Sequence, residues 1–321
     1  METPLLEVKN LRVEFALSRG VLTAVDSVSF RIHEKEALGI VGETGCGKSV
    51  MALSILGLVP SPPGKVSGSV SFNGQDIVGM TETQLCAIRG RHIGMIFQEP
   101  LTSLNPSLTI GEQVSECYRA HLRESKRLAW QRAEHILNEV RVPSPKTLMR
   151  MYPHELSGGM RQRVMIAIAL ACQPKLLIAD EPTTALDVTI QAQIIELLEE
   201  LREKLGLAMI FISHNLTVVA RLCDRIAVMY AGSLVELANT PSLVSHQLHP
   251  YTGGLFAALP RPALREGFLN TIPGTVCDLV HSPRGCKFHP RCFKRQEVCE
   301  KSRPELEHKA SDRAVACFFP E

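Results

Sequence analysis

The sequence predicts an α/β fold that combines a mixed sheet, a helical subdomain, an antiparallel β layer and a small cysteine-rich C-terminal extension. A glycine-rich loop joins an apolar strand to a helix at residues 42–49, and further apolar runs end in polar residues. Of the ten cysteines, five lie in the last 45 residues. We therefore expect one domain over residues 1–245, with helices at about 107–172, and an extension over 246–321.

The composition is that of an ordinary globular protein. Hydrophobic residues make up 45% of the 321 residues, charged residues make up 21%, and the net charge is +2. This balance provides no basic field for a nucleic-acid partner. No apolar run reaches the roughly 18 residues of a membrane span, and the N-terminus lacks the pattern of a signal peptide. We expect a cytosolic chain whose cysteines are reduced.

The N-terminal stretches predict an antiparallel layer. Residues 5–15 and 24–32 alternate roughly between apolar and polar, and residues 69–72 precede the turn Asn73-Gly74. Such alternation is typical of half-buried strands. Phe15 lies upstream of the glycine-rich loop, where its ring either stacks on an adenine or packs in the core.

The glycine-rich loop predicts a phosphate site. Residues 42–49 (GETGCGKS) follow the apolar strand 37–41 and precede a helix over residues 50–56. Glycines let the backbone fold into a nest of N–H groups, and the helix N-terminus adds further donors. Lys48 then reaches the β- and γ-phosphates, and Ser49 offers a hydroxyl to Mg²⁺. The predicted phosphate-binding residues are Gly42, Glu43, Thr44, Gly45, Cys46, Gly47, Lys48 and Ser49.

A second apolar strand, residues 93–98, ends in Gln98. A polar residue directly after a buried strand is well placed for a site at the carboxyl end of the sheet. The alternative is an amide that caps a sheet edge. A loop over residues 99–106 follows, and residues 109–142 are mostly helical in pattern, most clearly over 127–140.

Ser157 followed by Gly158 and Gly159 begins a helix that Pro174 ends. This helix start is rich in N–H donors and suits an anion, although no lysine accompanies it. The alternative interpretation is a simple N-cap.

Two adjacent carboxylates follow the buried strand 176–179. Because Asp180 and Glu181 cannot both face the same way, we expect two roles: Asp180 holds Mg²⁺, directly or through water, and Glu181 polarises an attacking water. The alternative is a solvated acidic turn. A long amphipathic helix is predicted over residues 188–205.

The strand 207–212 leads to His214, which suits contact with a γ-phosphate or with the attacking water. A lone histidine is as readily structural. Residues 226–230, before Ala231-Gly232, predict a hairpin that closes the core.

Taken together, these motifs resemble the nucleotide-binding subunit of an ABC transporter, whose fold is a P-loop NTPase core of the ABC type. The resemblance covers roughly the first 240 residues and rests on six motifs in the family's order. They are Walker A at 42–49, the Q-loop at Gln98, the signature 156–159, Walker B at 176–180 with Glu181, the D-loop 185–187 and the H-loop at His214.

This resemblance implies ATP with Mg²⁺, and two cassettes that pair head to tail. Ser157, Gly158 and Gly159 would then close over the nucleotide of the partner cassette. It also implies catalytic roles for Lys48, Gln98, Glu181 and His214, and Mg²⁺ ligation by Ser49, Gln98 and Asp180. Cys46 stands where serine is usual in Walker A; we expect little loss, because the backbone N–H does the binding.

Within the family, the chain is similar to the ATPase subunits of dipeptide and oligopeptide importers, a group that includes nickel importers. The carrying stretches are residues 97–106, 180–187 and 249–252 (HPYT). The resemblance implies a second ATPase subunit, usually a paralogue, two membrane permease subunits and, indirectly, an extracytoplasmic binding protein. It places the chain peripherally on the cytoplasmic face of the membrane. The rival interpretations are a soluble ABC ATPase that acts on nucleic acid or ribosomes, and a kinase-like P-loop enzyme.

Four cysteines of the extension are spaced C-x5-C-x6-C-x17-C. A proline-rich segment this short buries little core unaided, so thiolates around a metal centre would hold it together. Paired C-x2-C spacing, usual for zinc, is absent, whereas four cysteines suit a [4Fe–4S] cluster, which the peptide-importer relatives carry here. Zinc and free thiols remain the alternatives, and Cys277 is interpreted as a non-ligand. The predicted ligands are Cys286, Cys292, Cys299 and Cys317.

Overall fold

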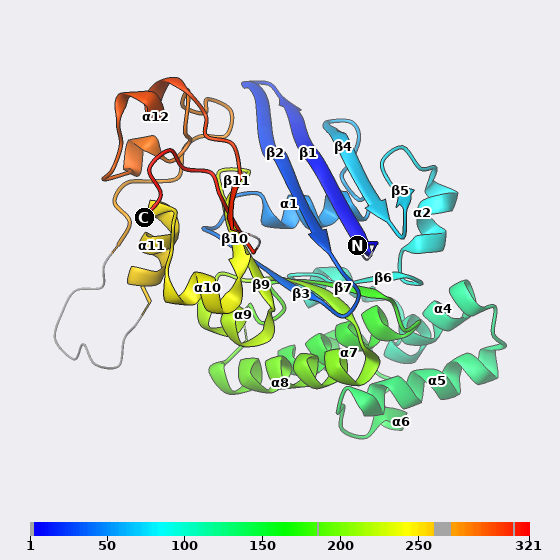
Figure 1. Ribbon diagram of the computed structural model, residues 1–321. Coiled ribbons are helices and arrows are strands. Elements are labelled where there is room, and N and C mark those ends of the chain that lie inside the picture. Colours follow the sequence, from blue (N-terminus) through cyan, green and yellow to red (C-terminus); the bar gives the residue numbers. More distant parts are fainter. Residues whose placement is uncertain (1–2, 185, 260–270, 311) are drawn as a thin grey trace.

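The structure is a computed structural model that describes residues 3–184, 186–259, 271–310 and 312–321. Within these ranges the strands form two sheets, which lie one above the other with helices beneath the larger one (Figure 1). The predicted α/β fold with an antiparallel layer is confirmed.

The larger sheet carries the predicted site. Its order is β11-β12-β10-β9-β3-β8-β7-β6, and the central strands β9, β3, β8, β7 and β6 run parallel. The carboxyl ends of these strands therefore meet at one edge. The central strands are β3 (Ala37–Val41), β6 (Ile93–Ile96), β7 (Leu176–Asp180), β8 (Ala208–Ile212) and β9 (Arg225–Tyr230).

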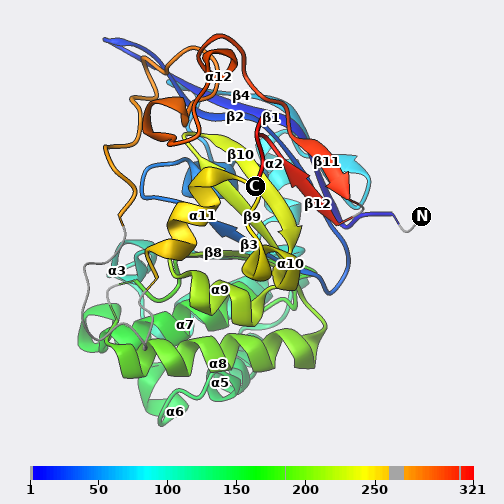
Figure 2. The same cartoon turned by 60° about the vertical axis from the view of Figure 1, so that its left-hand side comes forward.

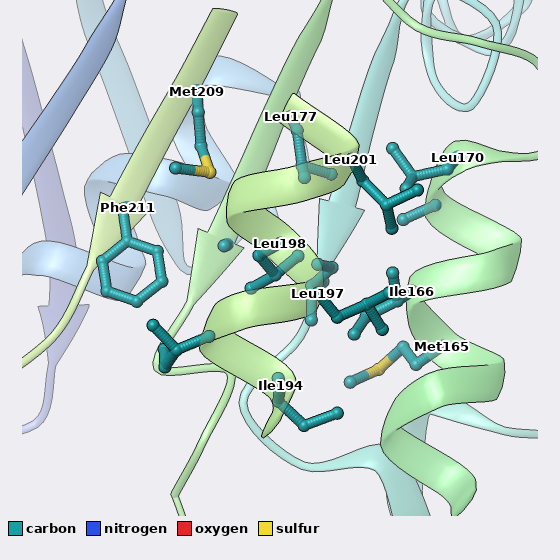
Figure 3. Packing of buried hydrophobic residues seen from close by; sticks show 14 of the residues in the cluster. Met165, Ile166, Leu170, Leu177, Ile194, Leu197, Leu198, Leu201, Met209 and Phe211 are labelled. Carbon is teal, nitrogen blue, oxygen red and sulfur yellow. The ribbon is translucent and has the colours of Figure 1, made fainter. Parts of the chain in front are cut away.

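Alternation along these strands separates two cores. On β8, Met209 and Phe211 face the core beneath the sheet, whereas Ile210 and Ile212 face the core under the antiparallel layer. A strand buried on both faces reads as a continuous apolar run, which is how the sequence shows it. Figure 3 shows the lower core, where side chains of α7 and α8 pack against Leu177, Met209 and Phe211.

The second sheet has the order β2-β1-β4-β5 and is antiparallel. The first three of its strands extend beyond the residues whose alternation predicts them, and bulges interrupt the register of β1 with β2. They are β1 (Leu6–Leu17), β2 (Gly20–Ile32), β4 (Gly64–Phe72) and β5 (Gln75–Asp76).

Helices cover the larger sheet and build the helical subdomain. Helix α8 begins and ends where the sequence predicts, since Asp187 caps its start and Gly206 adopts the left-handed backbone at its end. The helices before residue 240 are α1 (Lys48–Ile55), α2 (Glu82–Ile88), α3 (Pro100–Ser103), α4 (Ile110–Leu122), α5 (Lys126–Glu139), α6 (Pro145–Leu148), η1 (Pro153–Glu155), α7 (Gly158–Leu170), α8 (Val188–Leu205) and α9 (Leu216–Leu222).

Residues 246–259, 271–310 and 312–321, here called the C-terminal segment, lie beside the antiparallel layer (Figures 1 and 2). Its strand β12 pairs with β10 and so extends the larger sheet. The domain boundary near residue 245 stays a prediction. The remaining elements are β10 (Ser233–Asn239), α10 (Thr240–Ser245), α11 (Pro250–Ala257), η2 (His289–Arg291), α12 (Glu297–Lys301), β11 (Glu307–Ala310) and β12 (Arg313–Val315).

Candidate nucleotide site and cysteine-lined cavity

The glycine-rich loop lies between the end of β3 and the start of α1, as predicted. Two of its glycines are required by close backbone approaches. A Cβ on Gly42 would lie 2.2 Å from the Met229 carbonyl oxygen, and one on Gly47 would lie 2.2 Å from that of Ala24. Gly47 also has φ of 100°, a conformation that favours glycine. The loop is therefore packed from behind by β2 and β9.

The loop presents backbone donors to solvent or ligand. Lys48 is buried, and its Nζ donates to the carbonyl oxygens of Gly42 (2.9 Å) and Glu43 (3.1 Å). Among the described residues, no backbone acceptor takes the N–H groups of Gly45 and Gly47 in the loop or of the first three residues of α1. Unpartnered donors around a lysine are suited to an anion. These donors belong to Gly45, Gly47, Lys48, Ser49 and Val50.

Ser49 and Asp180 come together beside the loop. The Ser49 hydroxyl donates to Asp180 Oδ1 at 3.1 Å, and the Asp180 side chain is buried. Burial raises the pKa of the Asp180 carboxyl; the hydrogen bond from Ser49 opposes this, and the charge of Glu181 adds to it. A hydroxyl and a carboxylate are oxygen ligands of the kind Mg²⁺ prefers, and a bound cation would favour the ionised carboxylate.

Glu181 turns away from Asp180, as the sequence predicts for two adjacent carboxylates. Its backbone is left-handed, with φ of 45°, while its N–H still donates to the Ile212 carbonyl at 3.0 Å. A left-handed glutamate is strained and persists only where its surroundings fix it. This turn directs the two carboxylates to different partners.

Two of the predicted catalytic side chains, Gln98 and His214, converge on Glu181, whereas Lys48 contacts the phosphate loop. The Glu181 Oε2 atom lies 3.4 Å from His214 Nδ1 and accepts hydrogen bonds from Gln98 Nε2 (3.3 Å) and Thr184 Oγ1 (3.0 Å). Three strand ends, those of β6, β7 and β8, thus supply one cluster. Among the described residues, no hydrogen bond joins Gln98 to Ser49 or Asp180, so its role as a Mg²⁺ ligand stays a prediction.

The signature lies at the start of α7. The Ser157 hydroxyl caps the helix by accepting from the Met160 N–H at 3.4 Å, and Ser157 and Gly158 are exposed. A Cβ on Gly159 would lie 2.9 Å from the Ile190 side chain, so α8 packs closely behind. In the described part of the chain, no hydrogen bond or ion pair links the signature to the phosphate loop. Ala185 of the predicted D-loop lies outside the described residues.

Phe15 lies half-buried near the end of β1. Its ring packs beside Gly64 of β4 and against the core of the antiparallel layer. Adenine stacking by Phe15 stays a prediction.

The four predicted ligand cysteines line one small cavity, together with His249 and aromatic side chains. All are free thiols, and Cys277 does not line this cavity. Burial raises the pKa of Cys286 to about 11, and the other three thiols act in the same direction, which reflects their proximity. Among the described residues, however, no three His, Cys, Asp or Glu side chains are close enough to hold a single metal ion.

Three residues with contacts at the site were not predicted as such. Thr184 bonds Glu181, and its only sequence signal is its place three residues after that carboxylate. Tyr251 and Arg291 contact Glu43 of the phosphate loop. Tyr251 stands in the HPYT stretch, which the sequence singles out without a role, whereas Arg291 carries no sequence signal.

Comparisons with known proteins agree with this geometry. An ABC transporter family model matches residues 25–184, and a model of the oligopeptide/dipeptide transporter C-terminal region matches residues 235–299. The oligopeptide transport ATP-binding protein OppD of Escherichia coli K12 is 48% identical over 98% of this chain and 93% of that protein. The dipeptide transport ATP-binding protein DppD of Bacillus subtilis 168 is 44% identical over 98% and 94%.

The fold also matches a solved dimeric ATP-binding cassette in a post-hydrolysis state with ADP and Pi. The match covers 73% of this chain and 98% of the cassette. Its TM-score is 0.66 and its identity 29%. The chain belongs to the ABC transporter family and is an ABC ATPase. Within that family, it groups with the ATP-binding subunits of oligopeptide and dipeptide transporters. In the part of the chain that the structure describes, no helix is long and apolar enough to span a membrane.

Proposed function

We propose that this chain binds and hydrolyses ATP to drive import of dipeptides or oligopeptides through a membrane permease. The convergence of Gln98, Thr184 and His214 on Glu181, beside the Ser49–Asp180 pair, carries this proposal. The similarity to OppD and DppD supports the substrate class and a peripheral position on the cytoplasmic face of the membrane.

In this mechanism, Lys48 and the N–H donors of the loop hold the triphosphate. Glu181 orients the attacking water and takes its proton, while His214 and Gln98 hold the Glu181 carboxylate in place. Ser49 and Asp180 are the residues that would hold Mg²⁺, which neutralises phosphate charge. Lys48 stabilises the charge that spreads over the transferred phosphoryl group.

The signature serves a second ATPase subunit. Ser157, Gly158 and Gly159 are exposed or half-exposed at a donor-rich helix start, and no hydrogen bond among the described residues links them to the phosphate loop of their own chain. They would bind the γ-phosphate held by the partner, so that ATP favours the closed pair. Residues 98–106 would carry that motion to the permease.

Co-purification tests the proposal. The chain, isolated from its own membranes in detergent, is expected to bring two permease subunits and a second ATPase subunit. Labelled dipeptides and longer peptides should enter cells that contain the complex, and loss of this chain should abolish that uptake. Ribosomes or DNA in place of permeases would contradict import, and uptake of nickel chelates alone would reassign the substrate.

We further propose that Cys286, Cys292, Cys299 and Cys317 hold a [4Fe–4S] cluster. Four thiols around one cavity are the donor set such a cluster needs. A cluster also separates its ligands more widely than a single ion does, because iron and sulfide atoms lie between them. Such spacing is compatible with the lack of a single-ion site among the described residues.

Anaerobic purification tests the cluster. Iron and acid-labile sulfide are expected in near-equal amounts, with brown absorbance, and Cys299→Ser should lose most of both. Cys277→Ser is the matched control and should keep them. Zinc alone, or no metal at all, would contradict the assignment.

A further inference from the structure

Among the described residues, the hydrogen bonds from the C-terminal segment to the phosphate loop all go to Glu43. The Arg291 guanidinium donates to both oxygens of the Glu43 carboxylate, at 2.9 and 3.1 Å. The Glu43 backbone N–H donates to the Tyr251 hydroxyl oxygen at 3.0 Å. Two residues more than 200 positions away in sequence therefore hold the second residue of Walker A.

These partners are themselves firmly held. The Arg291 side chain is only 7% exposed and also donates to the carbonyl oxygens of Pro273 (2.9 Å) and Ile272 (3.3 Å). Tyr251 is fully buried, and its ring packs edge-on against Tyr230. A bidentate ion pair whose arginine is held in this way is strong and geometrically specific.

Glu43 is also tied inward, to the rest of the loop. Its carbonyl oxygen accepts from Lys48 Nζ at 3.1 Å and from the Cys46 N–H at 3.2 Å. Its carboxylate, N–H and carbonyl are thus all engaged, the first two by the C-terminal segment and the last by the loop. A loop held in its binding conformation loses less conformational freedom when the ligand arrives.

We propose that Arg291 and Tyr251 are positioning residues of the nucleotide site, which act through Glu43 to keep the phosphate loop in its binding conformation. The C-terminal segment thereby sets the affinity of the cassette for nucleotide. The inference rests on the nucleotide site proposed above. The sharpest expectation is a change in nucleotide affinity without a matching change in the rate at saturation.

The test is binding of fluorescent Mg²⁺–ADP to the full chain, with the ATPase KM and kcat measured on the complex. Arg291→Ala should weaken binding by about 5- to 20-fold and raise KM, while kcat stays within about twofold. Arg291→Lys, which keeps the charge but loses the second contact, should fall in between, and Tyr251→Phe should weaken binding independently. Arg295→Ala is the matched control, because that arginine is exposed and makes no side-chain hydrogen bond or ion pair among the described residues.

A double variant establishes whether the effect runs through Glu43. In a Glu43→Gln background, Arg291→Ala should weaken nucleotide binding only a little further, because the carboxylate that Arg291 contacts has already been altered. Unchanged affinity in Arg291→Ala, an equal loss in Arg295→Ala, or a full Arg291→Ala loss in the Glu43→Gln background would each overturn the inference. If Arg291→Ala does not fold, Arg291→Lys and Tyr251→Phe decide the matter. A wild-type chain that binds no nucleotide would instead overturn the proposed function.

Discussion

The nucleotide site and the C-terminal segment are held in place by different kinds of interaction. The site lies at the ends of parallel strands whose side chains are buried on both faces, so the core fixes each loop. The C-terminal segment buries few apolar side chains among its described residues, such as Tyr251, Phe288 and Val315. It is joined to the cassette by charged contacts at Asp26, Glu43 and Glu236.

This contrast shows where each region is vulnerable. At the strand ends that form the site, we expect a polar side chain to be replaceable without loss of the fold, because the paired strands hold the backbone. In the C-terminal segment, by contrast, we expect a single cassette carboxylate to contribute a large share of the stability, because ion pairs join the segment to the cassette. Asp26, for example, accepts hydrogen bonds from Lys287 and Arg303 of this segment, and also from Arg12 of β1.

The largest effect is expected at Glu181. Glu181→Gln keeps the shape of the side chain but removes the base, so ATP hydrolysis in the assembled transporter should fall by about 10²–10⁴-fold. This corresponds to about 3–5 kcal/mol in the barrier. Nucleotide binding should persist, because the loop donors are untouched.

Glu196→Gln is the matched control, since Glu196 is exposed on α8. Phosphate release at the wild-type rate in Glu181→Gln would remove Glu181 from its role. Loss of binding together with hydrolysis would mean that the cassette depends on this side chain for its structure as well.

The sequence was most informative where local pattern and tertiary position coincide. Residues 42–49 stand between an apolar strand and a helix, and the bounds of α8 follow from its amphipathic pattern and Asp187 cap. The split between Asp180 and Glu181 was also predictable, because adjacent residues at a strand end face different ways. The left-handed backbone that directs Glu181 was not, since no glycine marks it.

The sequence was least informative for contacts between distant polar residues. The Arg291–Glu43 pair spans 248 positions. No pattern in the sequence around this arginine, which lies in a proline-rich stretch, predicts which residue it contacts. Strands β11 and β12 are short and sit in a segment that reads as irregular, so their pairing with the larger sheet follows only from the fold.

An intermediate effect is expected at Asp26, whose side chain is only 8% exposed. Asp26→Asn should lower the free energy of unfolding by about 1.5–3 kcal/mol at neutral pH, because charge-assisted hydrogen bonds are lost. Urea unfolding measures the change, and faster hydrogen exchange at residues 286–303 would place it in the C-terminal segment. Glu305→Gln, an exposed carboxylate of that segment, is the control.

The difference in the free energy of unfolding between wild type and Asp26→Asn should disappear at low pH. Burial alone would raise the pKa of Asp26, but Lys287 and Arg303 more than offset burial and hold it below its ordinary value. The stabilisation is therefore complete above the unfolded-state pKa of about 4 and is lost as the pH falls through the lower folded-state pKa. The difference between wild type and Asp26→Asn should begin to narrow below about pH 4 and should close only below the folded-state pKa of Asp26. A gap that stays constant on acidification would contradict this account of Asp26.

The smallest effect is expected at Lys301, which pairs with Glu297 on the exposed face of α12. Both side chains are at least 70% exposed, so water screens the pair, and fixing two long side chains costs entropy. Lys301→Ala should change the free energy of unfolding by less than about 0.5 kcal/mol, and by still less at high salt. A loss comparable to that of Asp26→Asn would mean that exposed pairs also hold the C-terminal segment. A small change at Lys301 would leave the carboxylates Asp26, Glu43 and Glu236 as the main charged contacts between the cassette and this segment.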